Sequence, residues 1–241
     1  HNIGYCDVEL GRFDDAQARL QRALAMFRER GHARGETMVL ASLGVLARRR
    51  GDLEQAEAFG RASLALAERI GNTLAVADTL DDLGQVLAQR GALDDAVALF
   101  DRALAMARKL GQVHLQCFVL LHRARAQAAR AGAAGAAQSL RDALALAGEH
   151  DFPTGRLMGL LGAAGLRAMA GDADALPAAA RWCSAAIAAA DGNVDVLGAV
   201  PAEVPGACIE AAAAPATHVA LDEATAFVAA QCDGATPVAA G

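Results

Sequence analysis

The sequence predicts an all-α fold made of stacked antiparallel helix hairpins, and two observations lead to this prediction. First, 54% of the 241 residues are hydrophobic but only 4% are aromatic, and alanine is the most frequent residue. Alanine has the highest helix propensity, whereas strands are enriched in β-branched and aromatic residues. Second, the segment Gly11-Arg12-Phe13-Asp14-Asp15-Ala16 recurs in related form at positions 51 and 91. A fixed period of this length is typical of repeat architectures.

The period of forty residues extends over most of the chain. Units start near positions 11, 51, 91 and 131, and a weak one starts near 171. Small and large apolar residues keep to separate columns, with one column formed by Ala16, Ala56, Ala96 and Ala136 and another by Leu24, Leu64, Leu104 and Leu144. Because a single hairpin leaves apolar faces exposed, the repeated columns predict that neighbouring hairpins stack and cover one another.

Each unit divides into two helices. Apolar residues in the segment 37–49 follow helical spacing, and so do those in the segment 53–70. Between the two segments, Gly51 provides a left-handed stop and Asp52 provides a cap for the following helix. With about three residues in each turn, every helix has about 17 residues and a length of ~25 Å. The small side chains at Gly44 and Ala56 predict a close crossing of the paired helices.

The repeats weaken toward the C-terminus, which predicts a boundary near residue 190. Residues 1–190 form the expected repeat domain. Residues 191–241 are rich in alanine and acidic, and they form either a cap or a partly disordered tail, with a last helix from Leu221 to Gln231. Because Gly4 falls in the same column as Gly44 and Gly84, the chain is expected to start inside a helix and to be one domain of a longer polypeptide.

These columns resemble the tetratricopeptide repeat family. In this family the first helix carries a Leu-Gly pair and the second carries an Ala, a large apolar residue and another Ala; the helix pair on either side of Gly91 has these as Leu83-Gly84, Ala96, Phe100 and Ala103. The chain departs from the family pattern in its longer period, where about 34 residues is usual, in Gly60 at a position for a large residue, and in lacking the tryptophan near the start of the first helix. The longer unit is similar to repeats in bacterial signal-transduction ATPases, maltose-regulator-like activators and kinase-linked sensors. The resemblance implies a right-handed superhelix.

Composition excludes several classes of function. Lys109 is the only lysine, and no glycine-rich loop precedes it, which excludes a P-loop nucleotide site and a protein kinase active site. A net charge of −6 without a basic stripe argues against direct binding of nucleic acid. Five dispersed cysteines and the lack of a long apolar run predict a cytoplasmic protein with no membrane segment. No catalytic set and no cofactor motif are recognised, so we expect no enzyme and no cofactor.

One group of residues invites a metal-site hypothesis. His114, Cys117 and His122 lie on one predicted helix. At about 100° per residue, His122 points far from Cys117, so the three side chains do not converge. We therefore predict a half-buried helix face here and no metal site.

In the resembled family the inner face of the first helices lines a concave groove. Carried over by column, this face predicts partner-binding residues at Arg48, Arg49, Asp78, Asp81, Asp82, Gln85, Gln89, Phe118, His122 and Arg125. The clustered carboxylates favour a basic or hydrogen-bond-donating partner, and the arginines favour its acidic groups. An equally weighted alternative is an ordinary solvated face on which Arg and acidic residues of adjacent units pair.

The sequence therefore predicts a non-enzymatic protein–protein interaction scaffold. Its partner is expected to be a protein, a peptide or another domain of the same polypeptide. The family resemblance implies the sensor or regulatory module of a larger bacterial signalling or transcription-regulating protein. The alternative is a small-ligand-binding or enzymatic domain that uses the helical groove.

Overall fold

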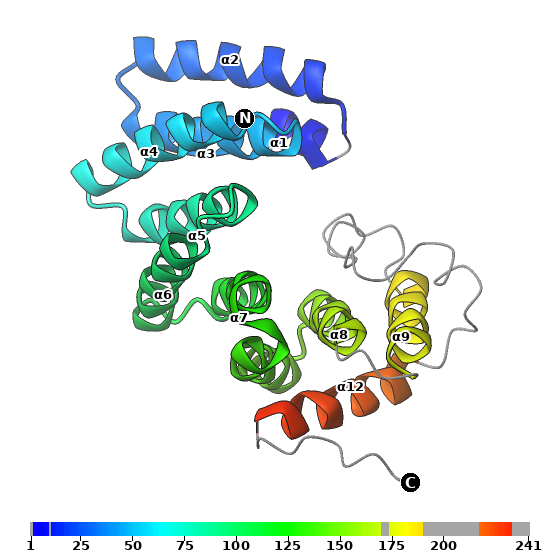
Figure 1. The fold of residues 1–241 in the computed structure, drawn as a ribbon. Coiled ribbons are helices and arrows are strands. Elements are labelled where there is room, and N and C mark those ends of the chain that lie inside the picture. The colour runs from blue at the N-terminus through cyan, green and yellow to red at the C-terminus, as the bar shows by residue number, and fades with distance from the viewer. Residues whose placement is uncertain (1, 10, 170–173, 190–216, 233–241) are drawn as a thin grey trace, which may run out of the picture. The chain divides into compact units, whose positions relative to one another are not determined.

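The computed structural model describes residues 2–9, 11–169, 174–189 and 217–232. The chain divides into two compact units, His1–Gln112 and Val113–Gly241. All the regular structure in the described residues is helical (Figure 1). The predicted boundary near residue 190 lies outside the described residues. The start of the fifth sequence repeat at Gly171-Asp172 and most of the predicted tail also lie outside them.

Unit 1 consists of three helix hairpins. They pair α1 (Asn2–Glu9) with α2 (Phe13–Glu29), α3 (Ala33–Arg49) with α4 (Leu53–Arg69), and α5 (Thr73–Gln89) with α6 (Leu93–Lys109). Each helix from α2 to α6 has 17 residues, as the sequence predicts. The first helices also contact one another, α1 with α3 and α3 with α5, so they form a continuous row in which successive hairpins stack.

The turn between α3 and α4 confirms the predicted stop and cap. Gly51 has a φ of +80°, a left-handed conformation that costs glycine little. The side chain of Asp52 accepts a hydrogen bond of 3.0 Å from the backbone N–H of Gln55. The turn between α5 and α6 has the same backbone form, but there Ala92 offers no side-chain cap.

This difference yields a matched pair of predictions on helix capping. Asp52→Ala should lower the free energy of unfolding by about 1 kcal/mol, because it removes a partner from an N-terminal N–H of α4. Ala92→Asp should raise it by a similar amount at the start of α6. Urea denaturation followed by circular dichroism measures both changes. Equal effects of the same sign would contradict the capping role.

The small-residue column is buried throughout the repeats. Ala16, Ala56, Ala96 and Ala136 are at most 1% exposed. Between α1, α2 and α3, Leu20 and Val39 lie in a core cluster. The leucine column is less uniform, because Leu104 is buried whereas Leu64 is half-buried. The alanine column therefore marks the helix crossings more reliably than the leucine column does.

Unit 2 begins with α7 (Val113–Glu149), which is two helical segments joined at a sharp break. Gly132 has a φ of +76° at this break, a left-handed conformation that costs glycine little. The two segments pack together, and the Arg123 guanidinium donates a hydrogen bond of 2.7 Å to the Ser139 hydroxyl. They are followed by α8 (Pro153–Ala168) and α9 (Ala175–Ala189), with Pro153 in the first turn of α8.

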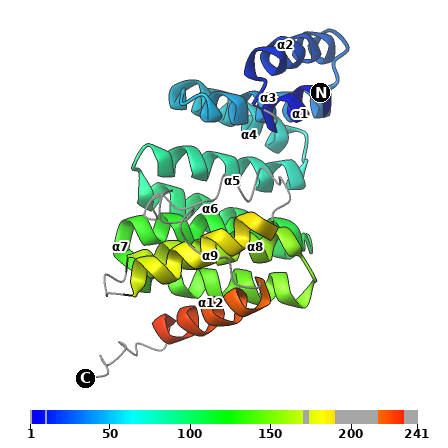
Figure 2. The ribbon, with the colours of Figure 1, turned by 90° about the vertical axis from the view of Figure 1, so that its right-hand side faces the viewer.

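The last described helix, α12 (Thr217–Cys232), packs against α7, α8 and α9 of unit 2 (Figure 2). The indole N–H of Trp182 donates a hydrogen bond of 2.9 Å to the Glu223 carboxylate. The Arg141 guanidinium donates to the carbonyl of Ala229 at 2.9 Å. The predicted last helix from Leu221 to Gln231 is thus present and longer at both ends.

The predicted all-α fold of stacked helix hairpins is confirmed. Within the described ranges we find no helix that combines the length and the apolar character needed to span a bilayer.

Candidate functional site

The predicted site residues fall into two groups, one in each unit. Unit 1 carries seven of them, Arg48, Arg49, Asp78, Asp81, Asp82, Gln85 and Gln89, and unit 2 carries Phe118, His122 and Arg125. In unit 1 they lie on α3 and α5, which are neighbours in the row of first helices. The exposed members are Arg49, Asp78 and Gln89, whereas Arg48, Asp82 and Gln85 are half-buried. We call the exposed and half-buried members on α5 and α3 the α3/α5 face.

Asp81 differs from the expectation of a partner-facing carboxylate. The residue is only 6% exposed, and its carboxylate accepts a hydrogen bond of 3.1 Å from the Gln85 amide nitrogen. Helical spacing does bring Asp78, Asp81, Asp82 and Gln85 together, as predicted, but it does not reveal how deeply each lies. Asp81 therefore supports the local packing of α5. Contact with a partner is expected at the more exposed Asp78 and Asp82.

The electrostatics of this face centre on Asp82. Burial, reinforced by the neighbouring carboxylates of Asp81 and Asp78, raises the pKa of Asp82 to about 7, although the Arg48 guanidinium partly counters this shift. Loss of solvent and the Asp81 carboxylate also raise the pKa of Asp78 to about 6, even though part of its side chain is exposed. The face therefore gains negative charge as the pH rises from about 5 to 8.

The raised pKa of Asp82 predicts a pH-dependent stability. In the unfolded chain this carboxyl loses its proton near pH 4, whereas in the folded chain it keeps the proton to about pH 7. Its stabilising contribution is therefore complete below pH 4 and is lost as the pH rises through 7. Asp82→Asn should raise the free energy of unfolding at pH 8 by on the order of 2 kcal/mol and change it little at pH 4.

Denaturation midpoints of wild type and Asp82→Asn from pH 4 to 8 measure this difference. Asp15→Asn, at an exposed position on α2, is the control and should give parallel curves. A constant difference between wild type and Asp82→Asn across this range would contradict the raised pKa.

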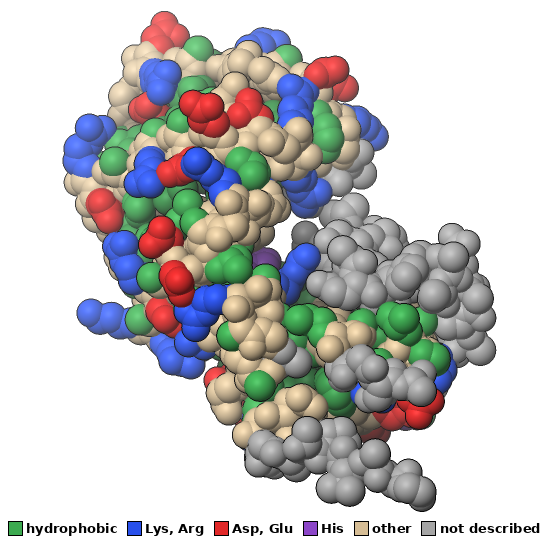
Figure 3. Space-filling view, in the orientation of Figure 1, with side chains coloured by type: hydrophobic (Ala, Val, Ile, Leu, Met, Phe, Trp, Pro, Cys, Tyr) green, Lys and Arg blue, Asp and Glu red, His purple; other side chains and the backbone are tan. Residues whose placement is uncertain are grey.

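Other charged residues of unit 1 pair between successive hairpins. Arg50, at the end of α3, donates hydrogen bonds of 2.5 Å to Asp14 and Gln17 of α2. Arg90, in the same repeat column, donates to Glu57 of α4. In the view of Figure 3, charges of both signs alternate over unit 1. Arg50 and Arg90 thus pair between successive hairpins, but both lie outside the predicted site, so the alternative of such pairing among the site residues stays a prediction.

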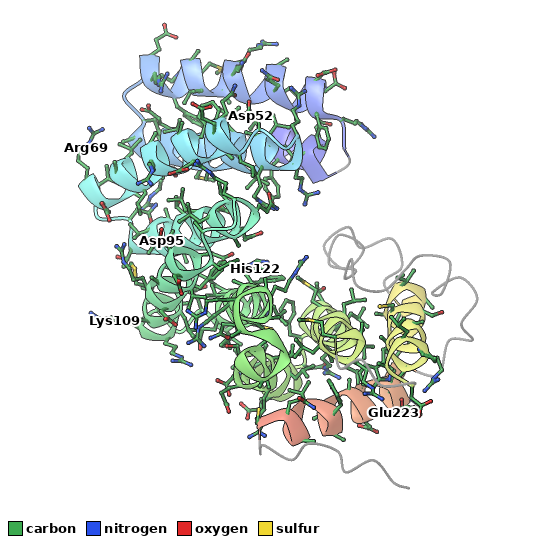
Figure 4. The ribbon with its side chains drawn as sticks, viewed as in Figure 1. Asp52, Arg69, Asp95, Lys109, His122 and Glu223 are labelled. Atoms are coloured by element: carbon green, nitrogen blue, oxygen red, sulfur yellow. The ribbon has the colours of Figure 1, made fainter. Side chains whose placement is uncertain are left out.

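In unit 2 the predicted residues line up on the first segment of α7. The half-buried Phe118 ring stacks on the His122 ring with centroids 6.5 Å apart and an interplanar angle of 19°. His122 is half-buried and extends from α7 (Figure 4), and Arg125 is exposed one turn further along. His114 stacks on Phe152 with centroids 4.4 Å apart, and Phe152 in turn meets the Phe118 ring edge-on at 5.4 Å.

Cys117 is fully buried, and its thiol donates a long hydrogen bond of 3.6 Å to the carbonyl of Ala143. Burial raises the pKa of this thiol to about 11, so it stays protonated at neutral pH. Within the described ranges, no group of three or more His, Cys, Asp or Glu side chains is arranged to hold a metal ion.

His122 and Arg125 border a cavity that the sequence did not predict. It has a volume of about 260 Å³ and lies between α7 and α8. The other described residues that line it are small or apolar, namely Leu121, Ala124, Ala128, Ala129, Leu140, Met158, Leu161, Gly162, Gly165, Leu166 and Met169. Most of the α8 residues lie where the repeats are weak, so no column identified them. The available signal was the run of alanines and glycines on both helices.

A comparison with known protein families finds a match over part of the chain. Residues 36–109 match the family model of the tetratricopeptide repeat, over most of α3 and all of α4, α5 and α6. Comparison with the curated proteins finds no similar sequence. The matched segment contains the α3/α5 face. Tetratricopeptide repeats generally mediate protein–protein interactions, so the match supports a scaffold role for this part of the chain.

Proposed function

We propose that the chain is a non-enzymatic scaffold that binds a protein or peptide on the α3/α5 face. The observation that carries the proposal is the row of first helices within the segment that matches the tetratricopeptide repeat family. On this row Asp78, Arg49 and Gln89 keep exposed polar side chains. A rigid row of helices binds a partner segment without the entropic cost of ordering itself.

The acidic residues of α5 favour a partner segment that carries basic or hydrogen-bond-donating groups. Asp78 is the exposed carboxylate of the group, and Asp82 adds charge above about pH 7. We place the scaffold in the cytoplasm, as a sensor or regulatory module of a larger bacterial signalling or transcription-regulating protein. The family resemblance of the forty-residue unit supports this placement.

Partner binding by charge-reversed variants tests the proposal. A partner is captured on the immobilised chain, identified by mass spectrometry, purified and titrated against each variant by calorimetry. Asp78→Arg should weaken its binding by at least about tenfold, because a like charge replaces the attractive one. Glu68→Arg, at an exposed position on α4, is the matched control and should stay within about twofold. Unchanged affinity of Asp78→Arg, with unchanged thermal unfolding, would remove α5 from the binding surface.

A further inference from the structure

We propose that the cavity of unit 2 binds an aliphatic carboxylic acid of about ten carbons. The chain of the ligand would lie between α7 and α8, and its carboxylate would lie at Arg125 and His122. This site does not depend on the α3/α5 face, which belongs to unit 1.

Small residues open the space between α7 and α8. Both helices carry small residues along this wall, Ala128 and Ala129 on α7 and Gly162 and Gly165 on α8. Leu140 closes the cavity at one side, because a Cβ placed on Gly162 would lie only 3.1 Å from the Leu140 Cδ1. The space is therefore bounded by packed side chains there, and small residues keep it open elsewhere.

The described walls of the cavity are mainly aliphatic. Leu121, Leu161, Leu166 and Met158 are all buried, so they present methyl and methylene groups to the cavity. Such walls offer a ligand dispersion contacts and the release of poorly bound water, but no hydrogen bonds. In Figure 3, hydrophobic side chains also gather over α8 and α9. The buried part of the ligand must therefore be hydrocarbon.

The opening of the cavity carries a positive charge at Arg125. The exposed lining residues Arg125, Ala129 and Met169 mark where the cavity meets solvent. Arg125 lies three residues after His122, so both are on the same face of α7. Among the residues that the structure describes, none of those lining the cavity is acidic. A guanidinium binds a carboxylate through two parallel hydrogen bonds, so the polar end of the ligand is expected to be an acid.

The volume of the cavity sets the size of the ligand. An engineered apolar cavity of about 150 Å³ holds benzene, which has six carbons. By the same ratio, the cavity of about 260 Å³ holds about ten carbons. One leucine side chain of a bound peptide would leave most of this space empty. The lining atoms would then lack dispersion contacts with the ligand. An unbranched acyl chain fills it better than a single peptide side chain does.

Calorimetric titration of the full chain with hexanoate, octanoate and decanoate tests chain length. We expect decanoate to bind, and each loss of two carbons to weaken binding roughly tenfold. Decanol, which has the same chain without the charge, should bind at least about tenfold more weakly than decanoate. Equal binding of decanol and decanoate would overturn the carboxylate assignment, and no binding of decanoate at millimolar concentration would overturn the site.

Two variants locate the ligand. Ala128→Phe should abolish decanoate binding by filling the cavity, and Arg125→Gln should weaken it at least about tenfold. Their controls are Ala145→Phe on α7 and Arg181→Gln on α9, both at exposed positions away from the cavity, and both should bind as wild type does. Thermal unfolding by circular dichroism confirms that each variant is folded.

Undiminished decanoate binding by a folded Ala128→Phe variant would show that the ligand lies elsewhere and would overturn the proposal. Size-exclusion chromatography with light scattering covers the remaining possibility. In one outcome wild type is a dimer that does not bind decanoate, and Ala128→Phe is a monomer. A second copy of the chain then occupies the cavity, and the proposal is wrong.

Discussion

Phe100→Ala is expected to lower the free energy of unfolding of unit 1 by about 3–5 kcal/mol. Phe100 is fully buried on α6, and its ring lies against Gly84 of α5, where a Cβ would come within 2.5 Å of it. Removing the ring leaves a cavity at the crossing of these two helices. Helices on both sides hold their positions through the same repeat contacts, so the cavity cannot collapse fully.

Urea denaturation followed by circular dichroism measures this loss. Because the chain has two compact units, the transitions are fitted separately for each unit. Leu110→Ala, at the end of the same hairpin, is the control, since this residue is 36% exposed and its truncation should cost only about 1 kcal/mol. A loss for Phe100→Ala as small as that of Leu110→Ala would mean that the crossing of α5 and α6 is not close-packed.

The repeat columns predicted helix lengths and turns because these depend on local chemistry. Gly51 ends α3 and Asp52 begins α4 through contacts within a few residues. Burial of Ala16 and Ala56 was also predictable, since the same crossing recurs in each hairpin. The periodicity therefore predicts the helices, the turns and the buried alanine column of unit 1.

The candidate sites were less predictable, for a physical reason. Asp81 and Asp78 share one face of α5, but neighbouring helices bury only Asp81, and spacing along a single helix carries no information about that. The cavity of unit 2 depends on which small residues of α7 meet which small residues of α8. The burial of Asp81 and the cavity of unit 2 both depend on which residues of neighbouring helices meet. The pattern along one helix does not specify these contacts.

A single repeat column shows that the residue on the facing helix determines how much space a glycine leaves. Gly44 and Gly84 occupy equivalent positions in successive hairpins, and both are buried. A Cβ on Gly44 would meet the carbonyl of Ala56 at 3.4 Å, an ordinary contact, because Gly60 stands opposite. A Cβ on Gly84 would approach the Phe100 ring at 2.5 Å, because Phe100 occupies the column of Gly60.

The same substitution is therefore expected to have opposite effects. Gly44→Ala should raise the free energy of unfolding by about 0.5–1 kcal/mol, since alanine restricts the unfolded chain and favours helix. Gly84→Ala should lower it by about 1–3 kcal/mol, since its methyl group forces Phe100 out of place. Denaturation of both variants under one condition gives the comparison, and effects of equal sign and size would contradict it.

A double-mutant cycle then separates the packing at this crossing from helix propensity. In a Phe100→Leu background the methyl group of Gly84→Ala meets a smaller and more adaptable side chain, so its cost should fall by at least about 1 kcal/mol. Gly44→Ala should keep its gain in that background, because its contacts are with Ala56 and Gly60. If Gly84→Ala costs as much in the Phe100→Leu background as in the wild type, the destabilisation arises in the backbone of α5 and the ring is not its cause.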